Sequence, residues 1–111
     1  MSDLWYRALD AIGKVAFAPT SYRLDRVNEE ERPHITEVII SACRDLVAFA
    51  AQRRYFPNID PQHLEDWRNS IKAPILKVGG EEWRKDTFDL IDIAIDAIMK
   101  AAEAQHSRGA A

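Results

Sequence analysis

The segment between Pro33 and Gln52 predicts a helix that is apolar around more than half of its circumference. A first apolar stripe repeats along it at the helical spacing. The members of this stripe are Ile35, Val38, Ile39, Ala42, Leu46, Phe49 and Ala50. A second stripe of Ile40, Cys43 and Val47 lies beside the first. Because one neighbouring helix covers only part of such a surface, we expect this helix at the centre of a bundle or in contact with a second subunit.

Three further segments have helical patterns. In residues 3–17, apolar residues recur at the spacing i, i+4, i+7, i+11, which is one face of a helix. Asp60 followed by Pro61 is typical of a helix start, and Pro74 ends that helix or kinks it. A pair of glycines then precedes a long helix expected over residues 81–104. The sequence therefore predicts helices joined by short turns.

These patterns predict an all-α fold, because no stretch alternates apolar and polar residues for long enough to form a strand. We expect a single compact four-helix bundle-like domain over residues 1–104, with a long central second helix and a long C-terminal helix. Residues 105–111 are expected to form a flexible C-terminal tail. The expected core comprises Trp5, Leu9, Ile12, Ile35, Val38, Ile39, Ala42, Leu46, Phe49, Leu64, Trp67, Leu90, Ile91, Ala94 and Ile98.

The boundary before the central helix has two interpretations. Asn28 with Glu31 three residues later resembles a capping box, whereas Pro33 fits the first position of a helix. The run between Pro19 and Asn28 has no sustained period, so we expect a connector that packs onto the core.

Composition and charge exclude several classes of protein. With 111 residues, the chain has room for one hydrophobic core. Fifteen Lys and Arg against eighteen Asp and Glu give a net charge of −3, which argues against binding to a nucleic acid polymer or to an anionic membrane surface. The single cysteine, Cys43, excludes an intrachain disulfide and suits a reducing compartment. We therefore expect a cytoplasmic protein.

The last predicted helix has an acidic face. Its members are Glu82, Asp86, Asp89, Asp92 and Asp96. Carboxylates stacked at helical spacing can hold Mg²⁺, which prefers oxygen ligands. The same face also carries Lys85 and Lys100, so the alternative is a solvated surface with i, i+4 ion pairs.

The stretch EEWRKDTFDLIDIAIDAIMKA, with Asp89 and Asp92 spaced as D-x-x-D, resembles the E-x-x-D helix of the MazG-type all-α nucleoside triphosphate pyrophosphohydrolases. The resemblance covers about a fifth of the chain. It implies Mg²⁺-dependent cleavage of nucleotides to monophosphates, with Asp89 and Asp92 as metal ligands. The E-E-x-x-E helix that this family carries upstream is not reproduced, either by residues 29–31 or by Glu65 with Asp66.

Arginine and aromatic residues gather where the central helix ends. The group comprises Arg53, Arg54, Tyr55, Phe56 and, further on, Trp67. These residue types are enriched at interface hot spots and also stack on nucleobases. They are therefore candidate partner-binding residues. In the alternative, the two arginines complement the helix dipole while the aromatic rings close the core.

No residue is predicted to be catalytic. The three histidines lack metal-ligand spacing, and no phosphate-binding glycine loop or nucleophile motif occurs. We therefore expect a small cytoplasmic interaction protein that is not an enzyme and needs no cofactor. It would act as an adaptor or inhibitor of a partner protein, as small phage and bacterial accessory proteins do, or would associate as a homo-oligomer. The alternatives are the Mg²⁺-dependent pyrophosphohydrolase and an oligomer that sequesters a nucleotide.

Overall fold

The computed structural model describes residues 3–17, 32–56, 58–78 and 80–110. Within these ranges the chain forms four α-helices and one 3-10 helix, and no strand. In chain order they are α1 (Asp3–Ala16), α3 (Arg32–Tyr55), α4 (Pro61–Lys72), η2 (Ala73–Lys77) and α5 (Glu81–Ala110). The predicted all-α, bundle-like fold is confirmed.

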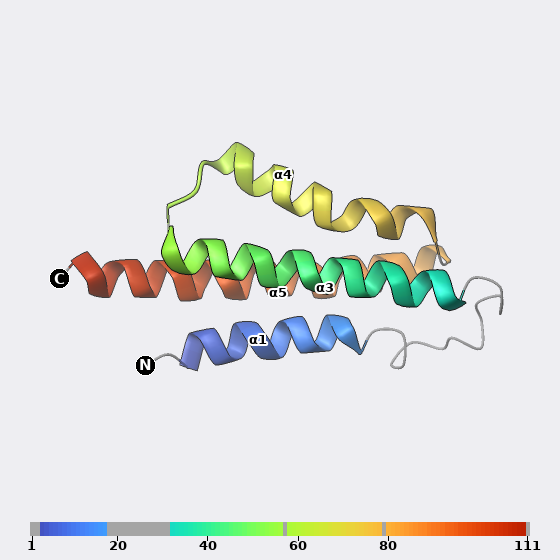
Figure 1. Cartoon of the computed structure of the whole chain (residues 1–111), viewed down its shortest axis with the longest axis horizontal. Coiled ribbons are helices and arrows are strands. Elements are labelled where there is room, and N and C mark those ends of the chain that lie inside the picture. The colour runs from blue at the N-terminus through green and yellow to red at the C-terminus, as the bar shows by residue number, and fades with distance from the viewer. Residues whose placement is uncertain (1–2, 18–31, 57, 79, 111) are drawn as a thin grey trace.

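The two longest helices form the middle of the molecule. Figure 1 shows α3 lying in front of α5, with α1 along one side of this pair and α4 with η2 along the other. Helix α3 contacts every other element, so its predicted central position is confirmed. The molecule is elongated, with extents of 53 × 27 × 18 Å, because all the helices run along one axis.

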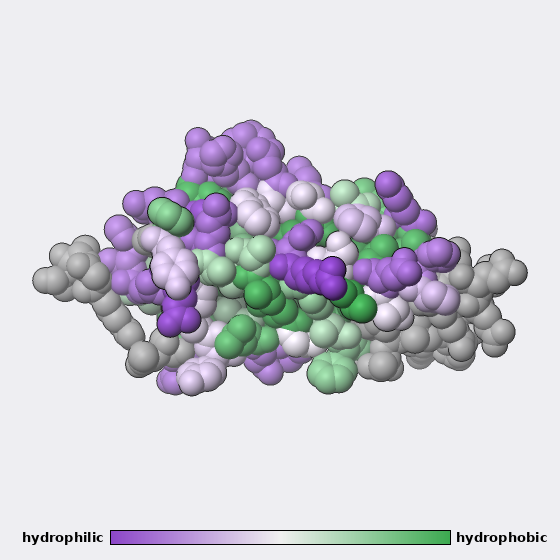
Figure 2. Space-filling model, viewed as in Figure 1, coloured by the Kyte–Doolittle hydropathy of each residue, from purple (hydrophilic) through white to green (hydrophobic). Residues whose placement is uncertain are grey.

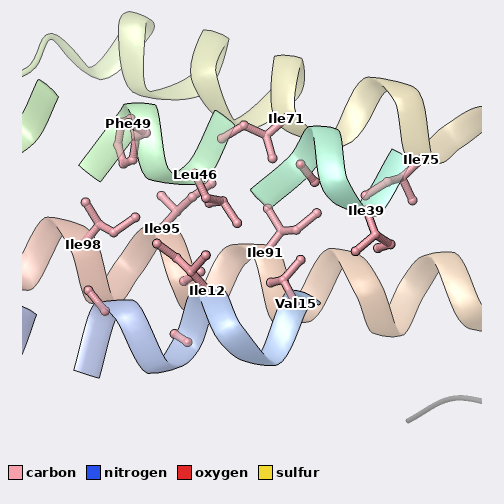
Figure 3. Packing of buried hydrophobic residues seen from close by; sticks show 14 of the residues in the cluster. Ile12, Val15, Ile39, Leu46, Phe49, Ile71, Ile75, Ile91, Ile95 and Ile98 are labelled. Carbon is pink, nitrogen blue, oxygen red and sulfur yellow. The ribbon is translucent and has the colours of Figure 1, made fainter. Parts of the chain in front are cut away.

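The core lies between α3 and its neighbours. Figure 3 shows isoleucine side chains of α5 pointing toward Leu46 and Phe49 of α3. The first apolar stripe of α3 supplies five fully covered residues, namely Ile35, Ile39, Ala42, Leu46 and Phe49. Its remaining members, Val38 and Ala50, are half-buried at the edge of the same cluster. The helical periodicity thus identified the inner face of α3.

Helix α1 packs most extensively along α5. Both helices bury alanines, which are Ala8 and Ala11 in α1 and Ala94, Ala101 and Ala102 in α5. Small side chains let helix axes approach closely, so this composition suits a tight helix pair. Ile12 and Val15 complete the buried face of α1.

Helix α4 begins as its sequence predicts. The Asp60 side chain accepts a hydrogen bond from the Gln62 backbone N–H at 2.9 Å, and Pro61 occupies the first turn. The Asp60 carboxylate satisfies one of the unpaired backbone N–H groups of the first turn, and Pro61 has no N–H that would need a partner. Pro74 follows the last turn, and the chain continues as the short 3-10 helix η2. Ile71 and Ile75, one turn apart across this junction, are fully buried.

Two expectations, the burial of Leu9 and the end of the last helix at residue 104, are wrong. Leu9 is 57% exposed, because the buried face of α1 is formed by Ala8, Ala11, Ile12 and Val15, and Leu9 lies beyond the edge of this face. Helix α5 also continues past residue 104 to Ala110. The Gln105 side chain explains part of this extension, since it accepts a hydrogen bond from the Trp5 indole at 3.0 Å and donates one to the Arg54 carbonyl at 2.7 Å.

Two predictions fall outside the described residues. The connector expected between Pro19 and Asn28 and the capping box of Asn28 with Glu31 belong to residues 18–31. In the part of the chain that the structure describes, no helix is long and apolar enough to cross a membrane.

Candidate interaction surface

The second apolar stripe of α3 faces solvent. Ile40 is 48% exposed and Val47 is 52% exposed, with the half-buried Cys43 between them. Burial raises the pKa of the Cys43 thiol, so at neutral pH it is an apolar surface residue and not an activated nucleophile. These apolar residues of α3 therefore lie outside the buried core of the bundle.

The exposed stripe borders α1. On the other side of α3, the Phe49 ring packs on Trp67 of α4, with ring centroids 5.4 Å apart. Ile40 and Val47 point away from Phe49 at the helical spacing, and therefore lie on the side of α3 that is next to α1. Figure 2 shows hydrophobic side chains gathered across the middle of this face.

Leu9 extends this surface onto α1. It follows Trp5 by one helical turn, and Trp5 is joined through Gln105 to the C-terminal end of α3. This edge of α1 therefore lies beside α3. We name the surface formed by Leu9, Ile40, Cys43 and Val47 the α1–α3 strip.

The predicted partner-binding residues divide into an exposed and a buried set. Arg54, Tyr55 and Phe56 are exposed at the C-terminal end of α3. Arg54 follows Val47 by two turns and prolongs the strip, whereas Phe56 follows Phe49 by two turns and lies on the other side of the helix. Trp67 is half-buried against Phe49. Tyr55 and Phe56 thus do not close the core, as the alternative interpretation required.

Arg53 points inward and is only 5% exposed. Its Nη1 donates to the Asn58 carbonyl at 2.8 Å, and its guanidinium lies 5.8 Å from the centre of the Phe49 ring. Burial lowers the pKa of Arg53, and among the described residues its Nε has no hydrogen-bond partner. Arg53 therefore joins α3 to the turn before α4 and is not available to an incoming ligand in this conformation.

The acidic face of α5 makes ion pairs with α4. Both carboxylate oxygens of Asp92 are engaged, one by Arg68 Nη1 at 2.7 Å and the other by Lys72 Nζ at 2.9 Å. Arg68 also lies 3.5 Å from Glu65 and 3.7 Å from Asp96. Burial by itself raises the pKa of Asp92, but the hydrogen bonds and charges of Lys72 and Arg68 outweigh it and lower that pKa below its usual value. The cluster attaches α4 to α5.

Replacing Asp92 with asparagine is expected to lower the free energy of unfolding at pH 7 by about 1–2 kcal/mol, less than a fully buried pair would, because solvent screens the carboxylate. The folded-state pKa of Asp92 is depressed, so its contribution is present above the unfolded-state value of about 3.9 and is lost as the pH falls through the folded-state pKa. Urea denaturation between pH 7 and pH 2 should show that the difference in the free energy of unfolding between wild type and variant becomes smaller below about pH 4.

The matched control for this experiment is Asp89→Asn, one turn earlier on α5. Asp89 is exposed, so its replacement is expected to change the free energy of unfolding by less than about 0.5 kcal/mol. Equal losses at the two positions would contradict the role given to the ion cluster.

The predicted metal ligands do not meet as a metal site. Asp89 lies in solvent and Asp92 is held by two cations. Among the residues that the structure describes, no three His, Cys, Asp or Glu side chains are grouped to hold a metal ion. The magnesium role of Asp89 and Asp92 stays a prediction, and no observed geometry adds support to it.

Comparison with known proteins adds no assignment: no protein-family model, no curated protein and no solved structure matches this chain.

Proposed function

We propose that this protein is a small cytoplasmic interaction protein, not an enzyme, that acts as an adaptor or inhibitor by binding a partner protein through the α1–α3 strip. One observation carries the proposal. Leu9, Ile40 and Val47 remain about half exposed on one face of a bundle that buries Ile35, Ile39, Ala42, Leu46 and Phe49 of the other apolar stripe of α3. Adjacent apolar side chains left in water on one face are typical of an interaction site.

The strip has the energetic properties of a binding surface. Full burial of a Val, Leu or Ile side chain contributes about 1.5–3 kcal/mol, so covering the exposed half of each would contribute roughly 1 kcal/mol. Arg54 and Tyr55 at the end of the strip are of the residue types that dominate interface energetics. Both residues belong to the Arg/aromatic segment that the sequence predicted, and their position at the end of the apolar helix face supports the proposal.

Photo-crosslinking in the cells that make the protein tests this proposal. A photoreactive amino acid at Val47 should give a discrete adduct with a partner protein, and the additional substitution Ile40→Asp should reduce the yield about tenfold or more by placing a carboxylate in the contact. Circular dichroism is expected to stay unchanged, because Ile40 is outside the core. The same reagent at Asp89, on the exposed face of α5, is the matched control.

Two results would contradict the proposal. The first is equal crosslinking from Val47 and Asp89, since the strip would then have no preference over an ordinary solvated surface. The second is a Val47 adduct whose yield does not change with Ile40→Asp.

A further inference from the structure

Two arginines lie along the strip, and neither has a carboxylate partner in the part of the chain that the structure describes. Arg44 follows Ile40 by one turn and precedes Val47 by three residues, and Arg54 follows Val47 by two turns. Both side chains are exposed, and in the described ranges no carboxylate lies within ion-pair distance of either. In contrast, Arg68 and Lys72 on α4 are paired with Asp92. The strip therefore presents unneutralised positive charge between apolar side chains, although the chain as a whole carries −3.

These charges disfavour a second copy of this chain as the occupant. A symmetric pairing of two α3 helices that places Ile40 opposite Val47 has its two-fold axis between residues 43 and 44. Arg44 of each copy would then lie beside Arg44 of the other copy. Like charges brought together in a desolvated contact oppose association, so this face is poorly suited to self-pairing.

We infer that the strip binds an amphipathic helix of a partner protein that carries Asp or Glu between its apolar anchor residues. This inference rests on the proposed function and adds the chemistry of the partner. The distance from Ile40 to Tyr55 along α3 is about 22 Å, which is four turns of helix. A helix laid beside α1 and α3 would place its apolar residues on Leu9, Ile40 and Val47, as in helix-in-groove recognition. Its carboxylates would meet Arg44 and Arg54.

Two stapled helical peptides of 18 residues serve as probes. They share one leucine face, and their polar faces carry either glutamate or lysine. Fluorescence anisotropy should show the acidic peptide binding roughly tenfold more tightly than the basic one, with the difference shrinking at high salt. The net charge of −3 would favour the opposite order, so the expected result depends on the local charges of the strip.

The substitution Arg44→Glu should abolish or reverse the preference for the acidic peptide. Lys100→Glu is the matched control, because it changes the net charge equally on the exposed face of α5. It should leave the preference as it is in the wild type. If Arg44→Glu and Lys100→Glu change the preference for the acidic peptide by the same amount, the inference is overturned.

The remaining outcomes separate this inference from the proposed function. If both peptides bind equally and Val47→Asp abolishes both, the strip is an interaction surface but its partner is not selected by charge. If Val47→Asp has no effect on bound peptide, the proposed function fails too. The inference is overturned if neither peptide binds. It is also overturned if sedimentation shows concentration-dependent dimerisation that Val47→Asp removes, since the occupant of the strip would then be a second copy of this chain.

Discussion

Replacing Ile39 with alanine is expected to lower the free energy of unfolding by about 2–5 kcal/mol. Ile39 is only 3% exposed and belongs to the cluster that joins α3 to its neighbours (Figure 3). Truncation removes apolar contacts and leaves a cavity that close-packed surroundings fill only in part, and both effects destabilise the folded state. Chemical denaturation followed by circular dichroism measures the loss.

The matched control is Ile40→Ala, which makes the same change at the next residue of the same helix. Ile40 is about half exposed, so its replacement is expected to cost less than about 1 kcal/mol. Comparable losses at the two positions would show that the second stripe is covered in solution. A loss at Ile40 that grows with protein concentration would identify a second copy as the cover.

Replacing Trp83 with alanine is expected to have an effect of similar size, about 3–5 kcal/mol. Trp83 is buried in the first turns of α5, where its carbonyl accepts a hydrogen bond from the buried Thr87 hydroxyl at 2.7 Å. The large ring supplies apolar contact where α5 begins, and alanine cannot replace it. Thermal unfolding monitored by circular dichroism should show a clearly lowered midpoint.

The substitution Trp83→Phe distinguishes the contribution of the ring from that of its N–H group. The indole nitrogen is buried and has no hydrogen-bond partner among the described residues. An unpaired buried donor contributes nothing favourable, so phenylalanine should cost about 1 kcal/mol or less despite its smaller volume. A loss as large as that of Trp83→Ala would mean that the N–H group has a partner.

We expect different residues of α3 to determine the stability of the fold and the binding of a partner. The stripe through Ile39 and Leu46 stabilises the fold, whereas the stripe through Ile40 and Val47 contributes little to it. Substitutions in the second stripe therefore report on partner binding with the folded protein intact. This separation makes the crosslinking and peptide experiments interpretable.

Much of the fold was predictable because its signals are local. Apolar residues at i, i+3 and i+4 share a helix face wherever the helix is placed, so the inner stripe of α3 could be recognised without a neighbour. Asp60 and Pro61 mark the start of α4 for the same reason, since a cap depends on residues two or three positions away. The all-α class followed from these patterns.

The interaction surface could be predicted only in part. Both stripes of α3 were visible in the sequence, but periodicity does not show whether the second stripe is covered by a neighbouring helix, by a second subunit or by solvent. Leu9 was assigned to the core for this reason, and Arg53 was grouped with Arg54 although the two point to different sides of α3. Consecutive helical residues are about 100° apart, so neighbours in sequence are separated on the surface.

The sequence by itself determined the helical class, the approximate helix positions and the presence of a surplus apolar stripe on the central helix. The tertiary structure alone decided that this stripe faces solvent beside α1, that Asp92 pairs with cations 20 and 24 residues away, and that Gln105 ties α1 to α3. The physical reason is the range of the interactions. Helix formation depends on residues within a turn or two, whereas exposure and ion pairing depend on which helices the folded chain brings together.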